Sequence, residues 1–202
     1  PQPAINDLKN LLSDTDSVDL QSRIYLVLGE IYLANEDSDN AFHFLNLGAE
    51  TSKDRLTREQ IYFQIAELSY DKKIYEQALD SYKKVLNNSV SINRIRESNL
   101  KIIQTYRLLG QIEQSKSRIE KLLLNDDFSS IKADLRLELI KIELNQGNVA
   151  FAIESLDIIA QDYVNTKIAI EAYYILSTLY LESPNLDFEK SNFFMNEAMK
   201  QN

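Results

Sequence analysis

Apolar residues recur along this sequence at steps of three and four, which is the spacing of one face of an α-helix. The segment Tyr75–Leu86 shows this pattern, and its apolar face contains one small residue, Ala78. A small residue recurs every 37 positions, except that the last interval is two positions longer. These residues are Ala4, Ala41, Ala78, Ser115, Ala152 and Ser191.

Two rows of mostly larger apolar residues keep the same interval. Four positions after the small residues stand Leu8, Leu45, Tyr82, Ile119, Leu156 and Met195. Seven positions after them stand Leu11, Gly48, Val85, Leu122, Ile159 and Ala198. A fixed period between about 20 and 50 residues indicates a repeat array. We therefore expect the small residues to lie where neighbouring helices cross at close range.

Each period divides into two predicted helices, separated by short polar breaks. The predicted first helices are Leu20–Asn35, Thr57–Lys72, Ile92–Leu109, Ser129–Gln146 and Thr166–Ser183. The predicted second helices are Pro3–Ser13, Ser38–Thr51, Tyr75–Asn88, Ile112–Asn125, Val149–Tyr163 and Asp187–Gln201. We expect Gly110 and Gly147 to end helices in the left-handed conformation. The segment Thr57–Gln60 has the form of a capping box at a helix start.

A helix pair of this kind has apolar residues on both sides, so neighbouring pairs are expected to stack. We predict an all-α fold, a right-handed α-solenoid forming a single array over residues 1–202. The predicted repeats are 19–55, 56–91, 92–128, 129–165 and 166–202, preceded by a lone second helix in 1–18. Because the pattern begins midway through a repeat, we expect the sequence to be a piece of a longer protein.

The repeat resembles the tetratricopeptide repeat (TPR). The family's first-helix pattern is matched by Tyr25, Leu28-Gly29 and Tyr32, and its second-helix pattern by Ala78, Tyr82 and Val85. A second match to the first-helix pattern is Tyr173, Leu176-Ser177 and Tyr180. The segment Asp162–Tyr180 is similar to the longer repeats of bacterial envelope proteins.

The sequence departs from the family pattern at three places. Ile103 and Ile140 replace a small residue, so the helix pairs of repeats three and four should be splayed. Glu143 replaces the tyrosine in repeat four, and the period is 37 residues where the family has about 34.

The resemblance implies that a partner binds in a groove lined by the first helices. That face maps onto two rows, which are Leu26, Phe63, Leu100, Leu137, Tyr174 and Leu33, Tyr70, Arg107, Leu144, Leu181. A polar row between them is Glu30, Glu67, Gln104, Lys141 and Thr178. The candidate groove residues are Phe63, Glu67, Tyr70, Gln104, Arg107, Lys141, Tyr174 and Thr178. Phe63, Tyr70, Arg107 and Tyr174 are the expected anchors, because aromatic and arginine side chains dominate binding hot spots. The alternative is that these rows are core between adjacent first helices.

Composition narrows the partners. The net charge of −9 argues against nucleic acid, which usually requires a basic surface, and against anionic lipid. No apolar run approaches the roughly 20 residues of a membrane span. The absence of cysteine excludes disulfides and thiolate chemistry, and it leaves the compartment open. We therefore expect a protein or peptide partner.

Candidate chemistry is sparse. The single histidine, His43, lies within a predicted helix and cannot form a metal cluster alone. The segments Asp14–Asp19 and Glu36–Asn40 faintly resemble calcium loops, but they lack the required glycine and are better interpreted as helix caps. No phosphate-binding loop, dinucleotide fingerprint or nucleophile elbow occurs. The sequence therefore predicts neither an enzyme nor a cofactor.

Three functions remain. The first is a scaffold that binds a peptide or protein in the groove of the first helices. The second is a self-assembling structural element or spacer, with a homodimer formed through the end helices. Asp187–Gln201 favours such an end contact, because Phe188, Phe194, Met195 and Met199 make its face apolar. The third is a regulatory domain of a larger enzyme or envelope complex.

Overall fold

The structure, a computed structural model, describes residues 2–182 and 184–201. Every regular element in these two ranges is a helix, as predicted. The chain divides into two compact units, residues 1–111 and 112–202. The division falls inside the third predicted repeat, between its two helices. Ser183, the predicted end of the last first helix, lies outside the described residues.

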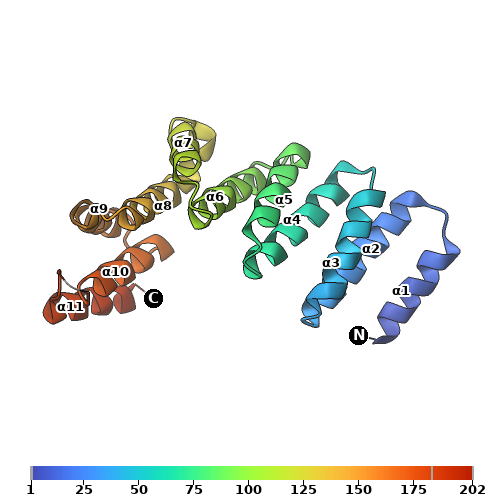
Figure 1. The fold of residues 1–202 in the computed structure, drawn as a ribbon, viewed down its shortest axis with the longest axis horizontal. Coiled ribbons are helices and arrows are strands. Elements are labelled where there is room, and N and C mark those ends of the chain that lie inside the picture. The colour runs from blue at the N-terminus through green and yellow to red at the C-terminus, as the bar shows by residue number, and fades with distance from the viewer. Residues whose placement is uncertain (1, 183, 202) are drawn as a thin grey trace. The chain divides into compact units, whose positions relative to one another are not determined.

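The first unit contains helices α1 to α6, which pack in sequence order (Figure 1). Their bounds are α1 Gln2–Asp14, α2 Val18–Ala34, α3 Ser38–Thr51, α4 Arg55–Asp71, α5 Tyr75–Asn88 and α6 Ile92–Leu108. The pairs α2–α3 and α4–α5 are antiparallel hairpins with extensive contact. Helix α4 also packs against α2, so successive first helices lie side by side in this unit.

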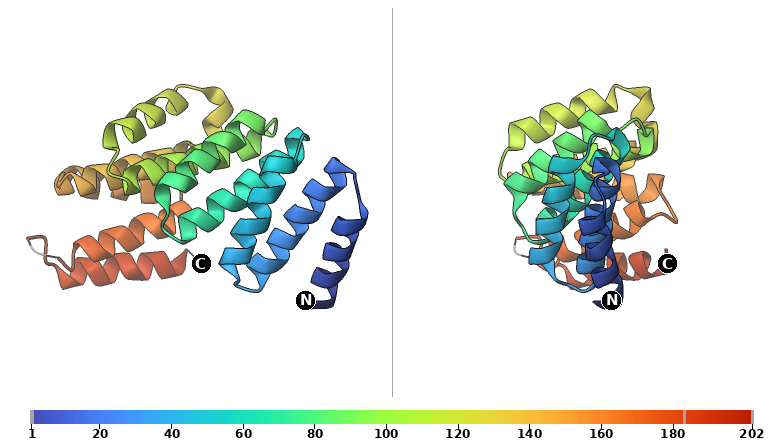
Figure 2. Two further views of the ribbon diagram at one scale, coloured as in Figure 1. Left: turned by 45° about the vertical axis from the view of Figure 1, so that its right-hand side comes forward. Right: turned by 90° about the vertical axis from the view of Figure 1, so that its right-hand side faces the viewer.

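The second unit also consists of second and first helices in turn along the chain (Figure 2). Its elements are α7 Ile112–Leu123, the short 3-10 helix η1 Asp126–Ile131, α8 Lys132–Asn145, α9 Val149–Asp162, α10 Lys167–Leu179 and α11 Phe188–Lys200. Helix α9 packs between α8 and α10, and α10 packs against α11. The stacked helix pairs expected from the 37-residue period are therefore present in both units.

The small residues lie at the helix crossings, as the periodicity predicts. Ala41, Ala78, Ser115 and Ala152 are completely buried, and Ser191 is nearly so. A close approach of two helices occurs at Gly29 of α2, where an added Cβ would come within 2.6 Å of Leu45 and 3.6 Å of the Ala41 carbonyl oxygen, both in α3. Ala4 is the exception and is exposed, because no described first helix precedes α1.

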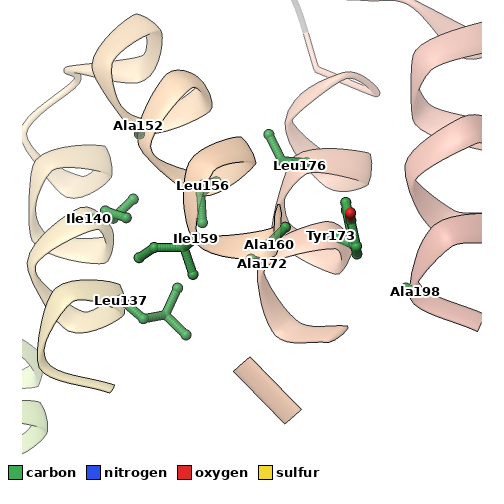
Figure 3. Close-up of a cluster of buried hydrophobic side chains, with 10 residues drawn as sticks. All are labelled: Leu137, Ile140, Ala152, Leu156, Ile159, Ala160, Ala172, Tyr173, Leu176 and Ala198. Carbon is green, nitrogen blue, oxygen red and sulfur yellow. The ribbon is translucent and has the colours of Figure 1, made fainter. Parts of the chain in front are cut away.

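The core of the second unit shows how two neighbouring helix pairs share one apolar cluster (Figure 3). The pair α8–α9 contributes Leu137, Ile140, Ala152, Leu156, Ile159 and Ala160, and the pair α10–α11 contributes Ala172, Tyr173, Leu176 and Ala198. Neither hairpin could bury this surface by itself, which is the reason for stacking in repeat arrays.

The pair α8–α9 carries Ile140 at a crossing that holds Gly29 or Ala66 in the first unit. It packs less extensively than α2–α3 or α4–α5, in agreement with the splaying expected for repeat four. The corresponding prediction for Ile103 concerns α6 and α7, which belong to different units, and it stays a prediction. Glu143, at the family's tyrosine position, pairs with Lys116 of α7 at 2.6 Å, and this bond and one from Asn148 lower its pKa.

Four first helices end on a residue with positive φ. These residues are Glu36, Lys73, Gly110 and Gly147, at φ of 61°, 61°, 71° and 84°. They stand 37 positions apart, although only the two glycines were predicted from the sequence. The next position in this register is Pro184, whose ring holds φ near −65° and prevents the left-handed conformation. This explains why the following loop is two residues longer.

Replacing Lys73 with glycine should raise the free energy of unfolding by about 1 kcal/mol, because glycine adopts positive φ without steric cost. Gly110→Ala should lower it by a similar amount. No atom lies within 4 Å of a Cβ added at Gly110, so the cost there is conformational. Urea unfolding followed by circular dichroism measures both variants. Equal stability of Lys73→Gly and the wild type would contradict this assignment.

Three local predictions need correction. The predicted capping box is wrong, since α4 begins at Arg55 and its cap is Asp54, whose carboxylate accepts hydrogen bonds from the Thr57 N–H at 2.7 Å and the Thr57 hydroxyl at 2.8 Å. The first helix of repeat four begins at Lys132 and not at Ser129, because η1 precedes it and buries Phe128. Several other helix ends differ from the prediction by one to four residues, whereas α3 and α5 have the predicted bounds.

Both calcium-like segments are helix caps, the preferred interpretation. Ser17 in the first accepts a hydrogen bond from the Leu20 N–H, and Asp37 in the second accepts one from the Asn40 N–H. Their side chains therefore satisfy helix N-termini.

Candidate binding face on the first helices

The predicted groove residues are divided between the two units. Helix α4 carries Phe63, Glu67 and Tyr70, helix α6 carries Gln104 and Arg107, helix α8 carries Lys141, and helix α10 carries Tyr174 and Thr178. The first five belong to the first unit and the last three to the second. The two groups are therefore described separately.

In the first unit, Phe63 is covered by a cation from the neighbouring first helix. The Arg94 guanidinium of α6 lies 3.6 Å from the centre of the Phe63 ring. Its Nε atom lies 3.5 Å from a carboxylate oxygen of Glu59, and its Nη1 atom 2.7 Å from one of Glu97. Phe63 also makes an edge contact with Tyr82 of α5. One face of this predicted anchor is thus already occupied.

Glu67 and Tyr70 share a second cation from α6. Lys101 Nζ lies 3.1 Å from a Glu67 oxygen and 4.7 Å from the centre of the Tyr70 ring. The other Glu67 oxygen accepts a hydrogen bond from the hydroxyl of the completely buried Tyr82. Burial and this hydrogen bond raise the pKa of Tyr82. Glu67, Tyr70 and Lys101 remain half-buried, so they are held in place and still reach the surface.

The remaining first-unit candidates lie on α6. Gln104 and Arg107 are both half-buried, and both already take part in interactions within the chain. The structure therefore brings Phe63, Glu67 and Tyr70 into one network through Arg94, Lys101 and Tyr82, with Gln104 and Arg107 further along α6.

In the second unit, Lys141 crosslinks two first helices. Its Nζ atom lies 2.8 Å from a carboxylate oxygen of Glu138 on the same helix and 2.6 Å from one of Glu171 on α10. Burial alone would lower the pKa of Lys141, but these two carboxylates outweigh it and raise the pKa. Glu138 is almost completely buried. Lys141 is therefore engaged in the structure of this unit.

Tyr174 and Thr178 are exposed on α10. The Thr178 hydroxyl donates a hydrogen bond to the Tyr174 carbonyl oxygen at 3.0 Å. The Tyr174 side chain is 58% exposed and lines a hollow of about 350 Å³ between α10 and α11. The other lining residues are Lys167, Ile170, Glu171, Met195, Ala198 and Met199. Tyr174 is thus the most accessible of the four predicted anchors.

A second hollow, of about 200 Å³, lies between α8 and α9. Leu139 of α8 and Phe151, Ser155 and Ile158 of α9 contribute to its lining, with Arg136 and Asp162 among the polar residues. Phe151 and Ile158 are each 53% exposed. These residues were not predicted, because the predicted groove rows contain only three positions of each first helix.

Some residues of the two apolar rows are core residues, and others are accessible as groove residues would be. Leu26 and Leu137 are buried, which matches the core alternative, whereas Leu33, Leu100 and Leu144 are half-buried and Leu181 is exposed. In the polar row, Glu30 is exposed. The groove itself stays a prediction, now centred on polar and aromatic groups more than on leucines.

The structure also places the single histidine. His43 lies exposed on α3, with its ring against Phe44. Within residues 2–182 and 184–201, no group of three or more His, Asp or Glu side chains is arranged to hold a metal ion. None of the helices described there combines the length and apolarity needed to cross a membrane.

The sequence pattern missed the cations that cover the aromatic residues. Arg94 and Lys101 lie 31 positions after Phe63 and Tyr70, not 37. Adjacent first helices meet with an offset of about two helical turns, so a search at the repeat period alone passes over these pairs. A search for basic residues nearly one period after each aromatic residue would have found them.

Comparison with known proteins supports the fold. No family model and no curated sequence matches the chain. Among solved structures, YrrB, a TPR protein with an unusual peptide-binding site, is 13% identical over 96% of this chain and 91% of its own, with a TM-score of 0.59. MamA from Desulfovibrio magneticus RS-1 is 11% identical over 90% of this chain and 94% of its own, with a TM-score of 0.62. TTC0263, a thermophilic TPR protein of Thermus thermophilus, is 18% identical over 89% of this chain and 91% of its own, with a TM-score of 0.54. At such low identity these likenesses show a TPR-like fold and nothing about function.

Proposed function

We propose that this chain is a non-catalytic interaction scaffold that binds a peptide or protein segment on the face of its first helices. The network of Glu67, Tyr70 and Lys101 carries the proposal. It combines a ring, a carboxylate and an ammonium group at the surface, held by the buried Tyr82 behind them. Side chains fixed in this way lose little conformational freedom on binding, which favours recognition.

The TPR-like fold supports the same function. Helical repeat arrays present extended surfaces on which a partner segment can lie across several repeats. YrrB, which shares the fold, has a peptide-binding site, and we extend peptide binding to this chain as part of the proposal. A bound segment would contact polar groups of several first helices and place its apolar side chains beside the aromatic rings.

Selection from a displayed random-peptide library against the purified chain tests this function. We expect peptides that bind the wild type and bind Tyr70→Ala/Lys101→Ala at least about tenfold more weakly, a loss of about 1.4 kcal/mol. Fluorescence anisotropy with the selected peptides measures the affinities. Tyr62→Ala is the matched control, because Tyr62 is a half-buried tyrosine on the same helix outside this network.

Two results would contradict the proposal. One is a selection that yields no binding peptide, and the other is a set of peptides that bind Tyr70→Ala/Lys101→Ala as tightly as the wild type. Circular dichroism of each variant verifies that the helical content is unchanged.

A further inference from the structure

The last helix pair has an apolar face that no described helix covers. Ile170 and Tyr174 of α10, with Leu181 just beyond, form one stripe, and Phe188, Met195 and Met199 of α11 form a parallel one. Helical spacing keeps Ile170 and Tyr174 on one side of α10, and Phe188, Met195 and Met199 on one side of α11. Tyr174, Phe188 and Met199 are 58%, 68% and 62% exposed, and the hollow of about 350 Å³ lies between the stripes.

In the earlier repeats, the residues equivalent to Tyr174 in α2 and α8 are covered by the first helix that follows. Leu26, the counterpart of Tyr174 in α2, is buried in a cluster that includes Ile61 and Ile65 of α4. Leu137, its counterpart in α8, is buried in the cluster that contains Ala172 and Leu176 of α10. Positions equivalent to Tyr174 are therefore built to receive a helix, and only the last one is open among the described repeats.

Polar groups beside this face repeat a spacing found in the first unit, two helical turns earlier in the 37-residue register. There Glu67 and Tyr70, three positions apart on α4, both contact Lys101 of the next first helix. Glu171 and Tyr174 have the same spacing on α10, and no described first helix follows them. Glu171 keeps 47% of its side chain exposed beside Lys141. Glu171 already pairs with Lys141 at 2.6 Å, and its exposed side leaves access for a second cation.

Lys167 gives this face a positive charge that can pair with Glu171 on the same face of a second copy. It is exposed on the rim of the hollow, one helical turn before Glu171. When two α10 helices lie antiparallel about a two-fold axis between Lys167 and Tyr174, each Lys167 faces the other copy's Glu171 and Tyr174. A two-fold arrangement uses each such contact twice, as in isologous dimers.

We propose that the α10–α11 face is the docking site for a second copy of this chain, with Tyr174 of each copy entering the hollow of the other and Lys167 contacting the opposing Glu171. The apolar stripes supply the buried area, and the paired charges set the antiparallel orientation. This surface shares no residue with the Glu67–Tyr70–Lys101 network, so dimerisation and peptide binding can each fail alone.

Sedimentation velocity of the full chain over a concentration series around about 1 µM tests the dimer. We expect twice the 23.3 kDa chain mass at the upper concentrations. Tyr174→Ala should shift the midpoint of association upward by at least about tenfold, because it removes the aromatic side chain that enters the opposing hollow. Phe151→Ala is the matched control, since Phe151 is a similarly exposed aromatic residue of the same unit outside this face.

Charge exchange identifies the orientation. Lys167→Glu alone and Glu171→Lys alone should each weaken dimerisation. A dimer formed by either variant places like charges at positions 167 and 171 of the opposing copies, twice across the axis. A mixture of the two variants should form a heterodimer, in which both opposing pairs are again opposite in charge. A general structural role of either residue would not produce this recovery on mixing.

Each alternative outcome is decisive. A chain that stays monomeric throughout the series overturns the proposal, even if another protein is later found on this face. A dimer that persists unchanged in Tyr174→Ala, or one lost equally in Phe151→Ala, places the contact elsewhere and overturns it as well. Met199→Glu repeats the first test from the second stripe, in case Tyr174→Ala fails to fold.

Discussion

Replacing Lys141 with methionine is expected to lower the free energy of unfolding by about 3 kcal/mol, the low end of the range for breaking a buried ion pair. The change removes the cation 2.8 Å from Glu138 and 2.6 Å from Glu171. Glu138 is 2% exposed, so water cannot replace the lost partner. Glu171 is more exposed and should contribute less to the cost.

The effect of Lys141→Met should depend on pH. In the wild type the pKa of Lys141 is raised, so its contribution is complete at neutral pH and is lost only as the pH rises through that pKa. The variant has no titratable group at this position. The difference in stability between variant and wild type should therefore narrow as the pH rises above the ordinary pKa of lysine and through the raised pKa of Lys141. Urea unfolding at several pH values measures this difference.

Two further variants identify the cause. Lys141→Met/Glu138→Leu should recover most of the lost stability, since an apolar pair leaves no buried charge. Lys200→Met removes the lysine of a more exposed pair with Glu197 and should change stability by less than about 1 kcal/mol. A loss in Lys141→Met that is independent of pH would show that packing, not charge, is responsible.

The second large effect is expected from Ala78→Leu, at about 1–3 kcal/mol of destabilisation. Ala78 is completely buried in one cluster with Ala66 of α4 and Ile102 of α6. Because Ala78 is completely buried in this cluster, a leucine side chain there would push α5 away from its neighbours. We expect a lower midpoint in urea unfolding, without loss of helical content in the absence of denaturant.

Ala4→Leu is the matched control for Ala78→Leu. Ala4 occupies the same position in the 37-residue register, but it is exposed on α1. The same substitution there should change stability by less than about 0.5 kcal/mol. Equal effects at both positions would mean that helix propensity governs the change, and the small residue would then have no role in packing.

Much of the fold could be predicted from the sequence because its determinants are local. The second helices Ser38–Thr51 and Tyr75–Asn88 have the predicted bounds, since amphipathic spacing and short polar breaks define them without help from other helices. The cap of α4 was missed because Asp54 and Thr57 can both cap a helix, and only the observed hydrogen bonds decide between them. The helix ends at Glu36 and Lys73 were missed because these residue types do not indicate positive φ.

The candidate site was less predictable because exposure depends on the neighbouring helix. Phe63 and Tyr174 occupy equivalent positions, yet Arg94 covers the first and no described helix covers the second. Lys141 was expected to be a groove residue, and its two ion pairs give it a structural role that the repeat pattern could not reveal. Whether the groove residues bind a partner is still a prediction.

The sequence by itself determined the all-α fold, the 37-residue repeat and the positions of the buried small residues. These features depend on residue size and polarity at helical spacing, which the chain carries wherever it lies in space. Only the tertiary structure decided which first-helix residues are paired, covered or open. Those properties come from the offset between adjacent helices, which brings Lys101 to Glu67 and Tyr70, and from the lack of a described helix after α11, which leaves Tyr174 exposed.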